Sequence, residues 1–249
     1  MKFNILLIGG LLLLLIGNIN ADITGPCQTV INKAWEKQAK CSWYLNLLTD
    51  IAKKYNYNFL FSHPISYDTT LYNKAIEDAC AAEFSCTFEE ASQIWNEILN
   101  NCPTELSTKV DWNANPNYLD NSIIEVYATL LAYYTVIPEH NSVCHKTTSG
   151  ELCGVESGKQ LVDWVKMVAP EGNATIAYTH ELVYKEDGTS LPIPRELFQC
   201  GECTTNMVQE YGNWINQHTV PVPIITNIFP SLDIFTSYFT CPIDFLIGN

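Results

Sequence analysis

The chain has 249 residues, and its 27 acidic residues against 13 basic ones give a formal net charge of −14 at pH 7. A surface this acidic repels phosphate groups, which argues against nucleic acid and anionic membrane surfaces as partners. The length is sufficient for a sizeable hydrophobic core in one large domain or two small ones.

Residues 1–21 have the layout of a secretory signal peptide. Lys2 precedes an apolar run from Ile5 to Ile16, and a short polar stretch then leads to the small residue Ala21. The run of about a dozen residues is shorter than the roughly 20 that a spanning helix needs, although an uncleaved signal anchor is the alternative. We therefore expect a secreted, extracellular protein with no transmembrane span once the signal has been removed.

Periodic apolar residues predict a mainly α-helical fold. In one long segment, Thr87 and Glu90 have the spacing of a capping box, and apolar residues follow at helical spacing. In a second segment, Ser122 and Glu125 have the same spacing, and Pro138 is expected to follow the end of the helix. We expect further helices over residues 27–40, 42–55, 72–82, 157–168 and 203–218.

The stretch 174–193 has a different pattern. Its residues alternate in part between apolar and polar, and Asp187-Gly188 is a turn signal, so we expect a small β-hairpin there. The fold class predicted is thus a disulfide-stabilised, bundle-like helical fold with one small hairpin. The loop 140–154 divides residues 22–249 into subregions 22–140 and 141–249, which we expect to form a single cysteine-rich domain.

All ten cysteines follow the signal segment. An even number of cysteines in an exported chain predicts structural disulfides, here up to five. They are Cys27, Cys41, Cys80, Cys86, Cys102, Cys144, Cys153, Cys200, Cys203 and Cys241. Asn173 begins an Asn-Ala-Thr sequence, which is an acceptor for N-glycosylation and agrees with export.

Helix geometry limits how the cysteines can pair. A helix over 88–101 would hold Cys86 and Cys102 roughly 20 Å apart, whereas the Cα atoms of a disulfide lie about 6 Å apart. These two cysteines should therefore not pair with each other. Cys144 and Cys153 flank a glycine-containing loop, "HKTTSGEL", and can meet.

The "CGEC" sequence at residues 200–203 admits three interpretations. A redox-active dithiol is favoured by the start of a helix, which lowers a thiolate pKa, but Glu202 opposes this and no βαβ context surrounds the motif. A zinc site needs four ligands, and no second closely spaced pair is present. Two structural half-cystines, each with a different partner, agree best with the sequence. We assign no catalytic residue, metal ligand or cofactor.

Several motifs together resemble a known group of proteins. They are "CAAEFSCTFEEASQIWNEILNNC" at 80–102, a tyrosine-rich helix, "VCHKTTSGELC" at 143–153 and "FQCGECTTNMVQEY" at 198–211. Over residues 80–215 the chain resembles a loose group of fungal secreted cysteine-rich proteins of unknown function. The resemblance implies secretion, disulfides and a helical fold, and it implies no reaction or cofactor.

Three functional hypotheses follow. The first is a secreted structural or interaction protein without catalytic activity, acting at the cell surface or beyond. The second is a carrier of lipid or another small apolar ligand, in which helical aromatic residues would enclose a cavity. These residues are Trp95, Tyr127, Tyr133, Tyr134 and Trp214. The third is an exported enzyme, either a CxxC oxidoreductase or a hydrolase.

Overall fold

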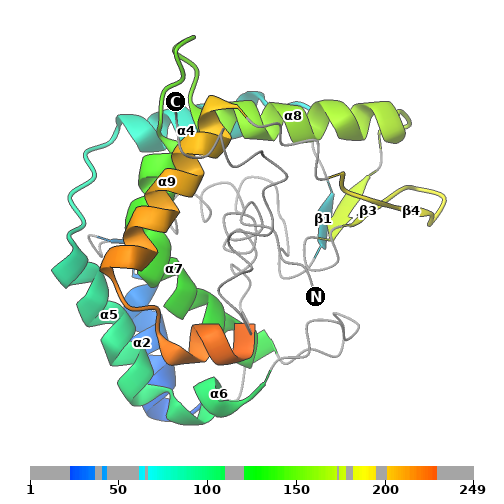
Figure 1. Cartoon of the computed structure of the whole chain (residues 1–249). Helices are drawn as coiled ribbons and strands as arrows, with labels where there is room; N and C mark the ends of the chain where they lie inside the picture. Colours follow the sequence, from blue (N-terminus) through cyan, green and yellow to red (C-terminus); the bar gives the residue numbers. More distant parts are fainter. Residues whose placement is uncertain are drawn as a thin grey trace.

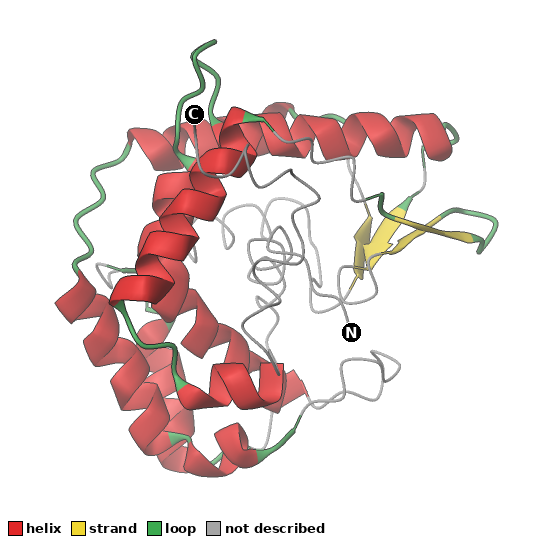
Figure 2. Cartoon of the chain, in the orientation of Figure 1, coloured by secondary structure: helices red, strands yellow, loops and turns green. Residues whose placement is uncertain are grey.

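We analysed a computed structural model of the chain, in which residues 23–36, 41–43, 62–64, 67–109, 121–172, 174–177, 182–194 and 201–228 are described (Figure 1). These residues form a mainly helical fold with one small sheet (Figure 2). The expected signal peptide, almost all of the helix predicted at 42–55, Asn173, Cys200 and Cys241 lie outside the described residues.

The helices broadly follow the expected segments. They are α2 (Gly25–Ala34), α4 (Thr70–Ala81), α5 (Phe88–Asn101), α6 (Pro103–Ser107), α7 (Asn121–Val143), α8 (Cys153–Val168), α9 (Glu202–Gln217) and the π-helix η4 (Ile224–Ile228). Among the described residues, none of these helices combines the length and the apolar character needed to cross a lipid bilayer.

The capping box predicted at the start of α5 is present. The Thr87 hydroxyl accepts a hydrogen bond from the Glu90 backbone at 3.2 Å, and the Thr87 backbone donates to Glu90 Oε2 at 3.0 Å. Behind this cap, Ala91, Trp95 and Ile98 form the buried face of the helix. Two otherwise unpaired backbone donors are thus satisfied locally, which fixes where α5 begins.

α7 is the central helix of the fold. It packs against α2, α4, α5, α6, α8, α9 and η4, and every residue from 126 to 136 is buried (Figure 1). A helix that is apolar around its whole circumference belongs in the interior of a protein. Periodic apolar residues predicted a helix in this segment but did not indicate how completely it is enclosed.

Two boundary predictions for α7 were wrong. The helix begins at Asn121, so Ser122 lies inside it instead of capping it. It also continues through Pro138 to Val143, although an interior proline removes a backbone donor and costs about 3 kcal/mol. Burial on several sides offsets this cost, and the helix continues past Pro138, where the Ser142 hydroxyl donates to the Pro138 carbonyl at 2.7 Å.

The small sheet contains the predicted hairpin and one strand that was not predicted. Its antiparallel strands are β1 (Ser62–Pro64), β2 (Thr175–Ala177), β3 (Leu182–Tyr184) and β4 (Ser190–Pro192), in that order across the sheet. Gly188 has a φ of +80° in the turn between β3 and β4, a conformation that favours glycine. Three residues are too few to show an alternating pattern, which is why β1 escaped prediction.

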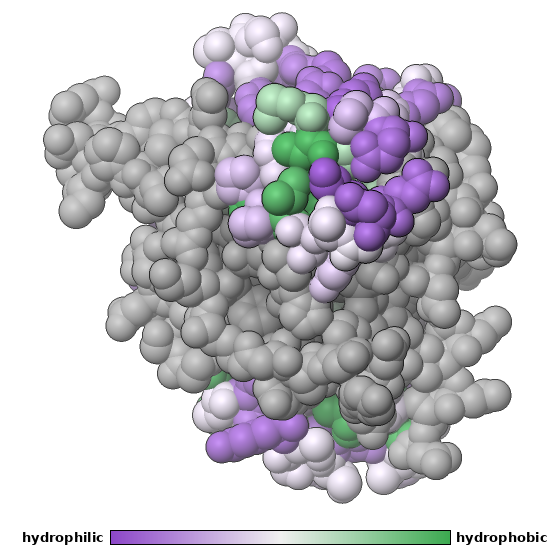
Figure 3. All heavy atoms as spheres, turned by 90° about the vertical axis from the view of Figure 1, so that its right-hand side faces the viewer, coloured by the Kyte–Doolittle hydropathy of each residue, from purple (hydrophilic) through white to green (hydrophobic). Residues whose placement is uncertain are grey.

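Two hydrophobic cores hold the elements together. The main core extends from Cys27 in α2 to Ile224 in η4 and so includes residues from both subregions. A smaller core joins α8 to the sheet through Val165, Ala169 and Val183. On the face that carries the sheet, a few hydrophobic side chains are bordered by hydrophilic ones (Figure 3).

α8 packs closely on α4 because glycine occupies the contact. A Cβ atom at Gly158 would lie 2.6 Å from Cε1 of Tyr72. We therefore expect Gly158→Ala to destabilise the protein by roughly 1–3 kcal/mol through overpacking, in spite of the higher helix propensity of alanine. Denaturant unfolding measures this change in the free energy of unfolding.

Gly212 in α9 provides the matched control. No atom lies within 4 Å of a Cβ built at this glycine. Gly212→Ala should accordingly stabilise the protein by up to about 1 kcal/mol through helix propensity alone. Equal effects of the two substitutions would contradict the close packing of α8 on α4.

Candidate functional site

The second cysteine of the CGEC motif forms a long-range disulfide. Cys203 bonds to Cys153, 50 residues earlier, with a Cα–Cα distance of 5.3 Å. Cys153 is the first residue of α8 and Cys203 the second of α9, so the bridge joins the N-termini of two helices. Because its sulfur is bonded, Cys203 is not available as a thiolate or as a zinc ligand. Cys200 lies outside the described residues.

Glu202, between the two cysteines of the motif, anchors the loop that connects α7 to α8. Its carboxylate accepts a hydrogen bond from the Thr148 backbone at 2.8 Å and lies 3.4 Å from Nε2 of His145. The hydrogen bond from the Thr148 backbone is the largest influence on the pKa of Glu202, which it lowers. The residue was expected to act on a neighbouring thiolate, whereas its contacts hold α9 against this loop.

The loop between α7 and α8 is held together by hydrogen bonds between its own backbone groups. The Thr147 backbone donates to the Glu151 carbonyl, the Cys153 backbone donates to the His145 carbonyl, and Gly150 turns the chain at a φ of +87°. The two ends of the loop therefore approach each other, as its sequence suggested. Cys144 and Cys153, at these two ends, nevertheless form disulfides with Cys80 and Cys203 and not with each other.

The other three disulfides also join separate segments of the chain. Their Cα–Cα distances are 4.7, 4.9 and 5.4 Å, and their sequence separations are 75, 45 and 64. They are Cys27–Cys102, Cys41–Cys86 and Cys80–Cys144. Cys86 and Cys102, at opposite ends of α5, thus have different partners, as the length of that helix requires.

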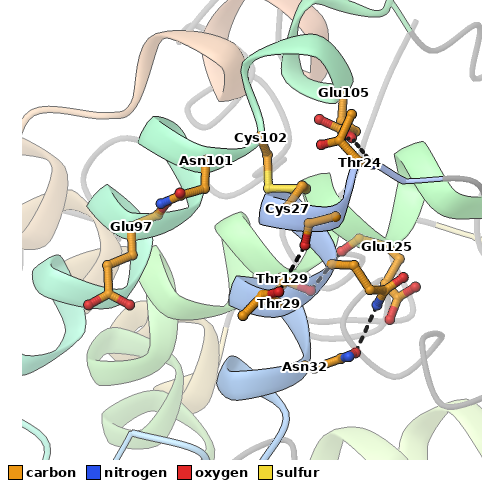
Figure 4. Close-up of a disulfide and its surroundings, with 12 residues drawn as sticks. Thr24, Cys27, Thr29, Asn32, Glu97, Asn101, Cys102, Glu105, Glu125 and Thr129 are labelled. Atoms are coloured by element: carbon orange, nitrogen blue, oxygen red, sulfur yellow. Dashed lines mark hydrogen bonds between the residues drawn. A yellow bond between two sulfur atoms is a disulfide. The ribbon is translucent and has the colours of Figure 1, made fainter.

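Two cysteines and a glutamate come close enough to suggest a metal centre. The sulfurs of Cys27 and Cys102 and a carboxylate oxygen of Glu105 lie within 4.8 Å of one another (Figure 4). The two sulfurs, however, are bonded to each other, so neither is the thiolate that binds a metal. In this oxidised state the group is a buried structural centre.

Glu105 has a definite structural role beside this disulfide. It is 3% exposed, and its Oε1 accepts hydrogen bonds from the backbone and the hydroxyl of Thr24 at 2.8 and 2.9 Å (Figure 4). Thr24 is the N-cap of α2 but makes no side-chain cap of its own. The Glu105 carboxylate of α6 therefore accepts hydrogen bonds at the N-terminus of α2 and interacts favourably with the dipole of that helix.

A second buried carboxyl lies where α4, α7 and α9 meet. Glu139 of α7 is 5% exposed, and the Tyr211 hydroxyl of α9 donates a hydrogen bond to its Oε2. Burial raises the pKa of Glu139 to about 7, although the hydrogen bond from Tyr211 acts in the opposite direction. Burial, with a smaller contribution from Glu139, raises the pKa of Tyr72 in α4 to about 12.

His140 follows Glu139 but faces a different environment. Its ring stacks on Phe84 at a centroid distance of 3.9 Å and meets Trp43 edge-on at 4.8 Å. Burial lowers the pKa of this imidazole, which favours its neutral form. Because Pro138 was expected to end the helix and the predicted loop begins at His140, neither Glu139 nor His140 was expected to lie in the interior.

The aromatic residues proposed to line a ligand cavity are packed into the core. Trp95 contacts Tyr134 at a ring-centroid distance of 5.4 Å, and Tyr134 contacts Trp214 at 6.2 Å. The hydroxyls of Tyr127, Tyr133 and Tyr134 donate to backbone carbonyls of the protein itself. These contacts account for the aromatic residues without a bound ligand.

Comparison with known proteins adds no further assignment. No protein-family model matches the chain, and no curated protein or solved structure matches it at a significant level. Its function must therefore be inferred from its own residues.

Proposed function

We propose that this chain is a secreted, disulfide-stabilised helical protein that acts outside the cell by binding or by forming structure, without catalysis. The observation that carries the proposal is the set of four disulfides, which use eight of the ten cysteines and connect segments 45–75 residues apart. Disulfides of this kind form and persist in oxidising compartments.

The CGEC motif supports a structural role in particular. An oxidoreductase of the CxxC type cycles through a bond between its two motif cysteines. Here Cys203 is bonded to Cys153, and Glu202 anchors the neighbouring loop. Cys203 thus attaches α9 to α8, and Glu202 attaches it to the preceding loop.

Sequence features outside the described residues agree with the proposal. Residues 1–21 have the pattern of a signal peptide, and Asn173 has that of a glycosylation acceptor. The resemblance to fungal secreted cysteine-rich proteins of unknown function points in the same direction. An excess of acidic residues suits a soluble extracellular protein and disfavours polyanionic partners.

Expression of the full chain in a eukaryotic secretory host tests the proposal. We expect protein in the medium that lacks residues 1–21, carries no accessible thiol and melts at a markedly lower temperature after reduction. We also expect no catalysis of disulfide reduction in an insulin turbidity assay. Retention in the cell with free thiols would contradict export, and turnover of insulin disulfides would restore the oxidoreductase hypothesis.

A further inference from the structure

The contact between Glu139 and Tyr211 is the polar centre of the packing between α7 and α9. Both residues are buried, at 5% and 3% exposure, and the phenol donates to the carboxyl directly. Buried carboxyls are normally satisfied by several donors or by a cation. Among the described residues, the ion pairs that the structure contains do not include Glu139.

Three other helices bring described residues to this region. α9 contributes Tyr211 and, one residue before it, Glu210, whose carboxylate accepts from Asn141 Nδ2 at 2.8 Å. α4 contributes the phenol of Tyr72. α8 reaches this region with Gly158, which packs on the Tyr72 ring and carries no charge. Burial therefore favours a protonated Glu139, and the hydrogen bond from Tyr211 offsets this effect only in part.

We propose that the Glu139–Tyr211 contact is a pH-sensitive latch between α7 and α9, closed while Glu139 carries its proton and released when that carboxyl ionises. In the closed state, the phenol and the neutral carboxyl pack without an uncompensated charge. Ionisation would place a negative charge in a buried site, where the hydrogen bond from Tyr211 compensates it only in part, and outward movement of α9 would admit water to the carboxylate.

The direction of the pH dependence follows from proton binding. Burial raises the pKa of Glu139 to about 7 in the folded protein, above the 4.5 of a glutamate exposed to solvent. The folded state therefore binds more protons than the unfolded state between these two values, so stability falls as pH rises through this range. The stabilising contribution of the latch is complete below about pH 4.5 and lost above about pH 7.

The pKa values of two other groups are also shifted by burial, and their effects on stability must be distinguished from that of Glu139. The pKa of Glu125, near the start of α7, is also raised to about 7 by burial. The lowered pKa of His140 has the opposite effect, because protonation of a buried imidazole destabilises the fold as pH falls. Glu139→Gln removes the latch carboxyl, retains its size and hydrogen-bonding capacity, and leaves both of these groups unchanged.

Hydrogen exchange of the intact, disulfide-bonded protein at roughly pH 5.5 and 8.5, corrected for intrinsic exchange rates, tests the latch. We expect protection in the middle of α9 to fall by on the order of 10-fold or more at the higher pH in the wild type, and to fall clearly less in Glu139→Gln, in which Glu125 still titrates. Equal loss of protection in both proteins, or no loss in the wild type, would overturn the proposal.

Infrared spectroscopy of the wild-type protein provides a measurement that does not depend on the folding of the variant. The absorption of buried, protonated carboxyls should decrease between about pH 6 and 8, with contributions from both Glu139 and Glu125. Tyr211→Phe should shift this transition to higher pH, because the hydrogen bond from Tyr211 lowers the pKa of Glu139. A wild-type protein without a carboxyl that titrates in this range would exclude the latch.

Discussion

Replacement of both Cys27 and Cys102 by alanine is expected to lower the free energy of unfolding by about 2–4 kcal/mol. The bridge connects residues 75 positions apart, so it restricts a large part of the unfolded chain. Both cysteines are fully buried in the main core, and their loss also leaves unfilled space beside Glu105. Guanidinium unfolding of the purified variant under non-reducing conditions measures the effect.

The double variant Cys153→Ala with Cys203→Ala is a suitable comparison. Its bridge spans 50 residues, for which chain entropy alone predicts a similar effect to within about 0.5 kcal/mol. Cys203 is only half-buried, however, so less packing is lost than at Cys27 and Cys102. If removal of the Cys27–Cys102 bridge cost less than about 1 kcal/mol, the central structural role assigned to it would be wrong.

Leu130→Ala is expected to destabilise the protein by about 2–5 kcal/mol. Leu130 is 0% exposed on α7, which packs against most of the other helices. Truncation of its side chain removes apolar contacts and leaves a cavity that a helix enclosed on all sides is poorly able to close. The free energy of unfolding and the melting temperature should both fall.

Met167→Ala on α8 is the control for this substitution. Its side chain is 72% exposed, so the change in stability should stay within about 0.5 kcal/mol. A leucine substitution no more harmful than the methionine substitution would show that α7 is not the enclosed centre of the fold.

Local sequence signals predicted the local features of this protein. Thr87 and Glu90 form the expected capping box because both partners of the motif lie within one turn of chain. Asp187-Gly188 makes the expected turn because its geometry is decided by a few adjacent residues. β1 and the enclosure of α7 depend on segments far away in the sequence, and local patterns carry little information about them.

Pro138 shows how tertiary packing overrides a local signal. Proline usually ends a helix, and no residue near Pro138 indicates a continuation. In the folded protein, burial of α7 outweighs the lost backbone hydrogen bond, and the helix continues for five more residues to Val143. This continuation is what places Glu139 and His140 in the interior.

The candidate site could be predicted only in part. The sequence favoured structural half-cystines for the CGEC motif, but it could not identify Cys153 as the partner of Cys203, because pairing depends on the approach of distant helices. The Glu139–Tyr211 pair brings together residues 72 positions apart, on α7 and α9. No short sequence motif predicts a contact between residues so far apart in the chain.

A non-reducing disulfide map of the secreted protein, with free thiols blocked at harvest, tests the disulfide framework most directly. Four bridges are expected: Cys27–Cys102, Cys41–Cys86, Cys80–Cys144 and Cys153–Cys203. The even count of ten cysteines then leaves Cys200 and Cys241 to each other as an expected fifth pair. A bond between Cys200 and Cys203, or a free thiol at Cys203, would contradict the structural role of the motif and with it the central claim.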